Sequence, residues 1–273
     1  MILSPIEQSI KRKIEAVGKP LKDWDIQIYR GVLTGCNEAF IIDAAKRAEI
    51  LSNCQSDDER KRTEAIIRPI LRGRDIRRYG YDWAGLYIIG TFPALKLDIE
   101  SYPSLKQYLL DFGYDRLKQT GDKGARKKTS NQWFETQDSI SYWEEFEKPK
   151  IMWIELSDES KFTLSANEIP LNTVFFMTGD NLPYLLAFLN SRAILWYFKR
   201  CLGSSSGVGT NRWLKFTIEK LPIPEICTSL ASLSDLGLKA PSLSMEITIE
   251  NTICSFYDLT LEERELLEVN GSN

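Results

Sequence analysis

The chain has 273 residues, of which 43% are hydrophobic and 27% are charged, so a disordered chain is excluded and a sizeable core is expected. The formal net charge of −3 excludes a uniformly basic nucleic-acid binder, and only local charge can argue for DNA. The sequence contains no histidine, which excludes Ser-His-Asp and Cys-His nucleophiles, HNH-type nucleases and most zinc catalysis but leaves carboxylate–metal chemistry open.

The first half of the chain mixes helix and strand patterns. A polar helix is predicted over residues 6–17, ending at Gly18. Alternating polar and apolar residues predict a strand over residues 25–29, and short apolar runs predict strands over residues 39–42 and 86–91. Helical spacing favours helices over residues 44–52, 60–68 and 104–112. A polar, glycine-containing loop is expected over residues 121–131.

The second half continues the mixture. Runs rich in Ile, Val, Phe and Trp predict strands over residues 150–156 and 173–178. The strongest helix pattern covers residues 181–201, and the glycine- and serine-rich residues 203–210 are typical of a loop. Residues 244–257 are helical or partly extended, and Thr260 with Glu263 predicts a capping box that opens a last helix. Because strands and helices mix without strict βαβ alternation, we expect an α+β fold of mixed twisted sheets with packed helices.

Cysteine spacing and hydropathy bear on the compartment. The five cysteines include no C-x-x-C pair, so we expect reduced thiols in a cytoplasm rather than a zinc ribbon or a disulfide framework. Residues 1–21 mix lysine, arginine and glutamate, unlike a signal peptide. The most apolar run, residues 182–198, is short and contains Asn190 and Arg192, which favours a buried helix over a membrane anchor.

The near-neutral net charge hides segregated charges. Residues 60–78 hold eight basic and two acidic side chains, and residues 116–128 hold six basic side chains and one acidic. Residues 244–273 hold seven acidic side chains and only Arg264 as a base. The sequence therefore contains two basic segments and an acidic tail.

Three segments are candidates for DNA contact. Arginine can bind guanine O6 and N7 or a phosphate with two parallel hydrogen bonds, and Asn or Gln can read adenine. The candidates are Arg68, Arg72, Arg74, Arg77 and Arg78 in the first segment; Arg126, Lys127, Lys128, Asn131, Gln132 and Trp133 in the second; and Asn211, Arg212 and Lys215 in the third. The alternatives are a solvated surface or ion pairs with the acidic tail for the first segment, an ordinary polar loop for the second, and a flexible linker ahead of a strand for the third.

Several motifs in order resemble one family. They are the segment 28–43 with Gly31, Gly35, Asn37, Ala39 and Phe40, IRPILRGRDI at residues 67–76, YPSL at 102–105, WFE at 133–135, FEKPKI at 146–151, LLAFLNS at 185–191, LPIP at 221–224 and YDLT at 257–260. Together they are similar to the TaqI-like C-terminal specificity domain of type IIG restriction–modification enzymes and related adenine-specific DNA methyltransferases. The resemblance covers residues 26–268.

The resemblance implies a target-recognition domain that grips double-stranded DNA beside a methyltransferase domain and reads bases largely through the major groove. That neighbouring domain would flip out an adenine and methylate N6 with S-adenosylmethionine, and type IIG enzymes also carry a nuclease domain. We therefore expect no catalysis and no cofactor in this chain, with S-adenosylmethionine and Mg²⁺ used only by the catalytic domains of the parent enzyme. The expected divisions are a helix and linker at residues 1–25, the recognition domain at 26–225, and an acidic helical segment at 226–273 that packs on it.

Our hypothesis from the sequence is that the three candidate segments line one DNA-facing surface. Residues 185–197 should be structural, and the acidic tail should lie away from the DNA. One alternative is a divalent-metal nuclease that uses Glu155, Asp158 and Glu159. Another is a module that docks a methyltransferase subunit without touching bases.

Overall fold

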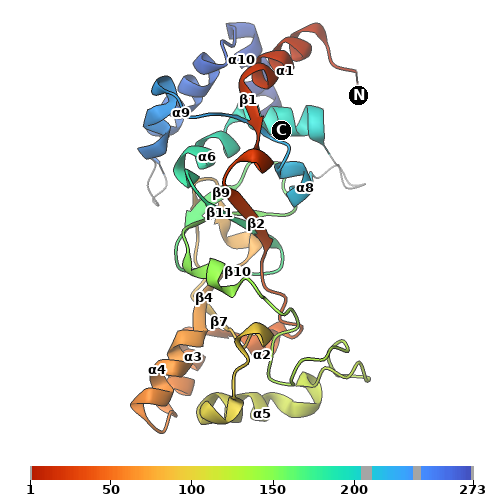
Figure 1. Ribbon diagram of the computed structural model, residues 1–273, viewed down its shortest axis with the longest axis vertical. Helices are drawn as coiled ribbons and strands as arrows, with labels where there is room; N and C mark the ends of the chain where they lie inside the picture. The colour runs from red at the N-terminus through yellow and green to blue at the C-terminus, as the bar shows by residue number, and fades with distance from the viewer. Residues whose placement is uncertain (1, 204–210, 236–240, 272–273) are drawn as a thin grey trace.

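A computed structural model describes residues 2–203, 211–235 and 241–271. The molecule is elongated, with a helical lobe at each end and β-sheets between them (Figure 1). We call the end that holds both chain termini the terminal lobe, and the other end, built around α2 to α5, the distal lobe. The combination of several separate sheets with many helices confirms the expected α+β class.

The chain begins with α1 (Pro5–Val17), whose start is fixed by a capping box. The backbone N–H of Glu7 donates to Ser4 Oγ at 3.4 Å, and that of Ser4 donates to Glu7 Oε2 at 2.8 Å. The helix ends at Gly18, where β1 (Gly18–Pro20) pairs antiparallel with β12 (Pro222–Pro224). A Cβ at Gly18 would lie 2.3 Å from the Cβ of Pro222, so this close pairing requires glycine. The pairing joins the start of the chain to the segment that precedes the acidic tail.

The first sheet is antiparallel, with the strand order β2-β11-β8-β9. Its strands are β2 (Ile26–Arg30), β8 (Lys150–Ile154), β9 (Phe162–Ser165) and β11 (Val174–Gly179). Alternate side chains face opposite ways, so Ile151 and Trp153 enter the core of the terminal lobe while Met152 and Phe176 face a second core toward the other sheet. Both faces are buried, which explains the nearly continuous apolar sequences of β8 and β11.

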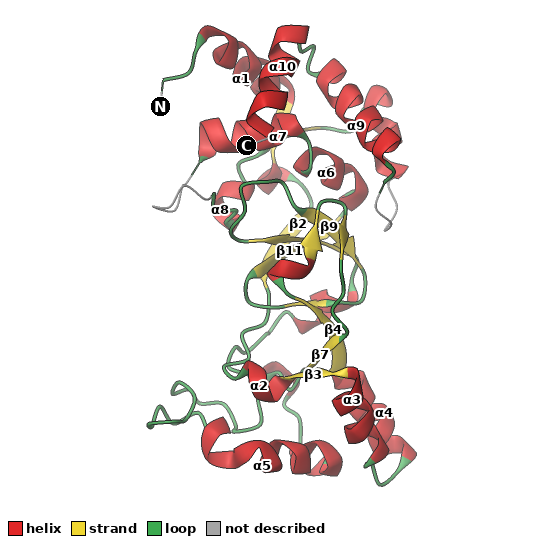
Figure 2. Ribbon diagram, turned by 180° about the vertical axis from the view of Figure 1, so that it is seen from behind, coloured by secondary structure: helices red, strands yellow, loops and turns green. Residues whose placement is uncertain are grey.

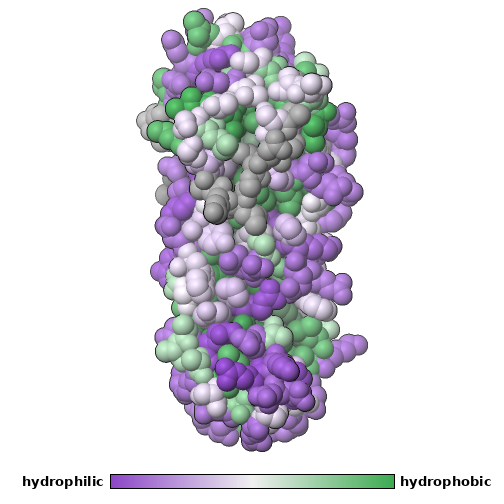
Figure 3. All heavy atoms as spheres, turned by 90° about the vertical axis from the view of Figure 1, so that its left-hand side faces the viewer, coloured by the Kyte–Doolittle hydropathy of each residue, from purple (hydrophilic) through white to green (hydrophobic). Residues whose placement is uncertain are grey.

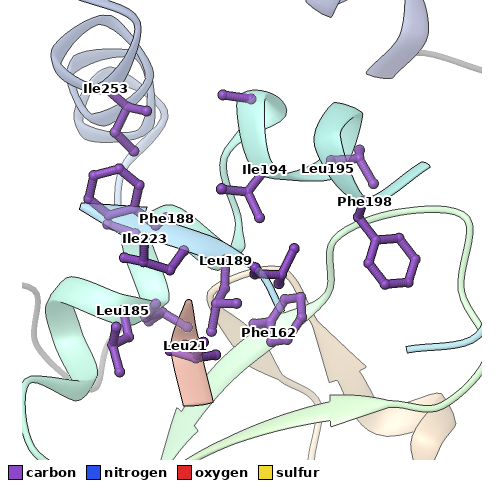
Figure 4. Packing of buried hydrophobic residues seen from close by; sticks show 14 of the residues in the cluster. Leu21, Phe162, Leu185, Phe188, Leu189, Ile194, Leu195, Phe198, Ile223 and Ile253 are labelled. Atoms are coloured by element: carbon purple, nitrogen blue, oxygen red, sulfur yellow. The ribbon is translucent and has the colours of Figure 1, made fainter. Parts of the chain in front are cut away.

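The terminal-lobe core packs α6 (Leu182–Leu189) and α7 (Arg192–Tyr197) over this sheet, with Leu189 near Phe162 and Phe188 near Ile253 of the C-terminal part (Figure 4). The sequence predicted one helix over residues 181–201, and this is wrong at its middle. The buried side chain of Asn190 pairs with the backbone of Phe162, accepting from N–H at 3.1 Å and donating to C=O at 2.9 Å. Ser191 then caps the start of α7. The helix is therefore interrupted between α6 and α7, and the Asn190 side chain pairs with the backbone of β9 as a neighbouring strand would.

The acidic tail is folded onto the terminal lobe as α9 (Leu243–Phe256) and α10 (Leu261–Gly271). The capping box predicted at Thr260 and Glu263 is confirmed, with hydrogen bonds of 2.7 and 3.2 Å. Glu263 also forms an ion pair of 2.8 Å with Lys13 of α1, which fastens the two ends of the chain together.

The second sheet has the order β10-β4-β7-β3, with β10 parallel to β4 and the other pairs antiparallel. Its strands are β3 (Ile41–Asp43), β4 (Ile67–Leu71), β7 (Leu86–Ile89) and β10 (Ile169–Pro170). The distal helices beside it are α2 (Asn37–Phe40), α3 (Ala44–Ser52), α4 (Asp57–Ile66) and α5 (Pro103–Leu117). One apolar cluster lies between the two sheets, and another lies between this sheet and the distal helices.

Two predicted boundaries in this region are wrong. Residues 39–42 were predicted as a strand, but Ala39 and Phe40 close the single turn of α2, in which Phe40 N–H donates to Cys36 C=O at 3.2 Å. The helix predicted over residues 60–68 ends at Ile66, because Ile67 and Arg68 pair with β7 as the start of β4.

Smaller elements complete the described chain. They are β5 (Ile76–Arg77), β6 (Gly80–Tyr81), α8 (Lys215–Ile218), a π-helix (Phe198–Leu202) and short 3-10 helices at Leu21–Asp23, Gly73–Asp75, Pro93–Leu95, Ile99–Ser101, Trp143–Glu147 and Thr228–Asp235. Of the loop predicted over residues 203–210, residues 204–210 lie outside the described residues. Within the described ranges, no helix is both long and apolar enough to span a membrane.

Candidate nucleic-acid interface

Arg30 is the last residue of β2. Its Nε donates to the carbonyl of Asn172 at 3.0 Å, and its Nη2 lies 3.4 Å from Glu155 Oε2. The guanidinium also lies 5.8 Å from the ring centre of Phe175. The side chain remains 57% exposed, so a fixed cation faces the solvent here.

Arg212 reaches the same carboxylate from another part of the chain. Its Nη2 donates to Glu155 Oε1 at 2.5 Å while the side chain stays 44% exposed. The next residue, Trp213, is buried, stacks on Phe198 at 3.7 Å between ring centres, and donates its indole N–H to Ser157 C=O at 2.9 Å. This anchor holds the start of α8, where Lys215 Nζ donates to the carbonyl of Ile28 at 3.2 Å.

The loop over residues 118–137 is organised around the buried guanidinium of Arg126. It donates to four backbone carbonyls, at distances from 2.7 to 3.0 Å, which belong to Leu117, Thr34, Glu135 and Trp133. Burial lowers the pKa of Arg126 to about 10, which leaves the side chain charged at neutral pH. The hydrogen bonds of Arg126 hold the backbone of this loop in place. The next two residues, Lys127 and Lys128, are exposed to solvent on it.

Asp138 connects this loop with Arg30. Asp138 N–H donates to Leu33 C=O at 3.2 Å, which holds the end of the loop beside the segment that follows Arg30. Burial raises the pKa of Asp138, and the positive charges of Arg30 and Lys127 partly oppose that rise. We define the cationic face as Arg30, Lys127, Arg212 and Lys215. Three separate stretches of the chain contribute to it.

The two ribbon views agree on the placement of these stretches. The 118–137 loop and α8 project to the same side of the molecule, on the right in Figure 1 and on the left in Figure 2. The helices α3, α4 and α9 lie on the other side (Figures 1 and 2). Figure 3 looks at that other side, where hydrophobic side chains gather in the upper half among hydrophilic ones.

The first candidate segment is mostly engaged in ion pairs. Arg68 pairs with Glu147, and Arg72 binds Asp75 through Nε at 2.9 Å and Nη2 at 2.7 Å. Those two guanidiniums are committed to contacts within the protein.

The rest of that segment points in different directions. Arg77 pairs with Asp82 at 2.9 Å, whereas Arg78 pairs with Glu246 and Glu250 of α9. Arg78 therefore fits the alternative of ion pairs with the acidic tail, and it lies by α9, away from the cationic face. Arg74 is exposed and forms no ion pair with the residues that the structure describes.

The polar residues of the second segment also have internal roles. Asn131 Nδ2 donates to the carbonyls of Thr136 and Gln137 at 3.1 and 2.9 Å. Trp133 is half-buried against Tyr114 and Phe134. Gln132 is exposed, and its side chain forms no hydrogen bond with the described part of the chain. In the third segment, Asn211 is half-buried and its N–H donates to Asp158 Oδ1 at 3.2 Å.

The carboxylates considered for a metal-dependent nuclease are occupied by other partners. Glu155 holds two arginines, and Glu159 pairs with Lys161 at 3.1 Å. Among the residues described, no group of three His, Cys, Asp or Glu side chains is placed to hold a metal ion. The acidic groups near β8 therefore orient cations.

A family model, the TaqI-like C-terminal specificity domain, matches residues 68–223, more than half of the chain. The chain belongs to this family. The family resemblance found in the sequence is confirmed, and the domain is a specificity domain of the restriction–modification type. The search of curated protein sequences found no match to this chain.

Solved structures show the same fold for this specificity domain. The type IIG restriction endonuclease BpuSI aligns with a TM-score of 0.55 at 15% identity, over 98% of this chain and 33% of BpuSI. The type IIL restriction–modification enzyme MmeI, solved in complex with DNA, aligns with a TM-score of 0.50 at 11% identity, over 93% of this chain and 36% of MmeI. The chain thus spans about a third of the length of each enzyme.

Sequence reasoning missed two residues of this surface and gave a third another role. Arg30 is a single arginine at a strand end and Asp138 a single carboxylate, so neither stood out by local charge, and Glu155 was considered only as a metal ligand. The sequence feature that could have indicated Arg30 is the glycine that follows it. A Cβ on Gly31 would lie 2.2 Å from the carbonyl oxygen of Leu171, so only glycine fits there. That close approach brings the end of β2 against residues 170–172 and fixes Arg30 beside Asn172.

Proposed function

We propose that this specificity domain recognises double-stranded DNA through the cationic face, on behalf of an adenine-N6 methyltransferase and endonuclease. Methyl transfer and cleavage, with S-adenosylmethionine and Mg²⁺, would belong to other domains of the enzyme, which are also its proposed partners. The proposed compartment is the cytoplasm, where the five free cysteines would remain reduced.

The observation that carries the proposal is the convergence of Arg30, Lys127, Arg212 and Lys215 on one face from three stretches of chain. Arg30, Arg212 and Lys215 keep 57%, 44% and 50% of their side-chain surface exposed although each is held by a protein partner. Exposed cations on one face suit contact with duplex DNA, in which lysine binds phosphates and arginine binds phosphates or guanine. The shared fold with MmeI, solved in complex with DNA, supports the same conclusion.

Candidates that the structure ties up internally are left out of the proposed contact set. Arg72, Arg78 and Arg126 each donate to acidic or carbonyl partners within the fold. Lys128, Gln132 and Arg74 are exposed and remain available. The proposed face is therefore narrower than the sequence suggested and includes Arg30.

Salt dependence of duplex binding tests the proposal. Each phosphate contact adds about 0.9 to the steepness of log affinity against log salt concentration. The double variant Lys127→Ala/Lys215→Ala should therefore reduce the slope by about 1.8. The control, Lys46→Ala/Lys61→Ala, removes the same charge from α3 and α4 on the other side and should leave the slope unchanged. A flat salt dependence of the unmodified chain, or equal slopes for the two double variants, would refute the proposal.

A further inference from the structure

One carboxylate holds two arginines of the cationic face at once. Glu155 follows β8 directly, accepts from Arg212 through Oε1 at 2.5 Å, and lies within 3.4 Å of Arg30 through Oε2. Its own backbone is fixed on both sides, because its N–H donates to Thr173 C=O at 3.1 Å and its C=O accepts from Trp213 N–H at 2.8 Å. Only 15% of its side chain is exposed, so it lies beneath the two guanidiniums.

Each guanidinium is restrained along one edge and open along the other. The Arg30 guanidinium is also held by Asn172 C=O and by the Phe175 ring, and the backbone of Arg212 is fixed by the β-bridge that pairs it with Leu156. Within the described part of the chain, neither Nη1 atom has a hydrogen-bond partner. Both arginines therefore present a free edge in a fixed orientation.

Restraint of this kind suits base recognition better than phosphate binding. A phosphate can be reached by a mobile cation, and a carboxylate nearby weakens that attraction. A guanine edge requires two N–H groups aligned with O6 and N7, so an arginine that is already oriented loses less conformational entropy on binding. A buried Glu155 between the two arginines therefore helps to orient their guanidiniums but does not strengthen their attraction for DNA phosphates.

We infer that Glu155 is a positioning residue that orients Arg30 and Arg212 to read guanine in the major groove. The inference rests on the proposed function, since it presumes that the cationic face meets duplex DNA. Oriented arginines would give the domain a preference for particular DNA sequences, which a pattern of positive charge alone does not provide.

Selection from duplexes with randomised central base pairs tests this inference. The variant Glu155→Gln keeps the shape but can no longer hold both arginines as a charged acceptor. Its guanine preference at one or two positions should fall at least about fivefold, while its affinity for the unselected pool stays equal or rises because a negative charge is lost. Arg30→Lys and Arg212→Lys keep the charge without the planar fork and should lose the same preference.

Glu159→Gln is the matched control. It removes a charge from the same loop, but Glu159 pairs only with Lys161 among the described ion pairs and is 64% exposed. It should keep the preference of the unmodified chain. A Glu155→Gln variant that keeps that preference, or that loses affinity for all sequences together with thermal stability, overturns the positioning role.

Measurements on the unmodified chain distinguish failure of the proposed function from failure of the inference about Glu155. If it shows no salt-dependent duplex binding, the proposed function fails and this inference with it. If it binds duplex DNA but selects no guanine, the inference alone fails.

Discussion

Replacing Arg126 with methionine tests how the loop over residues 118–137 is built. The substitution fills a similar volume but removes all four hydrogen bonds to backbone carbonyls. Two of these acceptors keep another partner: Thr34 C=O accepts from Gln137 N–H, and Glu135 C=O accepts from the Gln119 side chain. The carbonyls of Leu117 and Trp133 have no second donor among the described residues and are left unpaired.

The expected destabilisation follows from those two groups. A buried acceptor left unpaired costs about 1–3 kcal/mol, so Arg126→Met should lower the free energy of unfolding by about 2–6 kcal/mol. Urea denaturation followed by tryptophan fluorescence measures the change, since Trp133 lies in the same loop. Amide hydrogen exchange should also show faster exchange in residues 118–136.

Lys128→Met is the control for this experiment. Lys128 is exposed two residues further along, and its replacement should change stability by no more than about 0.5 kcal/mol. If Arg126→Met cost less than about 1 kcal/mol and left hydrogen exchange in the loop unchanged, the reasoning that Arg126 organises the loop would be refuted.

Two further predictions concern buried polar groups. Asn190→Leu leaves the backbone N–H of Phe162 unpaired, whereas Phe162 C=O still accepts from Tyr79 N–H, so chemical denaturation should show a loss of about 1–3 kcal/mol; an unchanged midpoint would contradict the role assigned to Asn190. Burial lowers the pKa of Lys150 from 10.5 to about 8, so the unfolded chain binds more protons above pH 8 and the stability contributed by this group rises with pH. Relative to Lys150→Met, the unmodified chain should gain about 1 kcal/mol between pH 7 and pH 9, and parallel pH profiles for the two proteins would exclude a buried, titrating lysine.

Local signals were sufficient where a few neighbouring residues decide the structure. The capping box at Thr260 and Glu263 needs only residues close in sequence, and the predicted final helix begins there. Strands β8 and β11 were found because apolar side chains on both faces leave a clear pattern, and β2 was found because its side chains alternate between buried and exposed. The break at Asn190 was missed because its partner, Phe162, is 28 residues away.

The same distance limit applies to the candidate interface. Arg78 has the same local appearance as a DNA-contacting arginine, but its partners Glu246 and Glu250 lie 168 and 172 residues further along the chain. Arg126 and Lys127 are adjacent, yet one is buried among carbonyls and the other faces the solvent. Net charge in a segment therefore located one of the three contributing stretches, the one with Lys127, and did not distinguish structural cations from available ones.

Chemical acetylation of lysines, read by mass spectrometry with and without duplex DNA, tests most directly whether the cationic face meets DNA. The account predicts that bound duplex protects Lys127 and Lys215 while Lys46 and Lys61, on α3 and α4, react as in the free protein. Protection of Lys46 and Lys61 with Lys127 and Lys215 still reactive, under conditions where the duplex is bound, would contradict it.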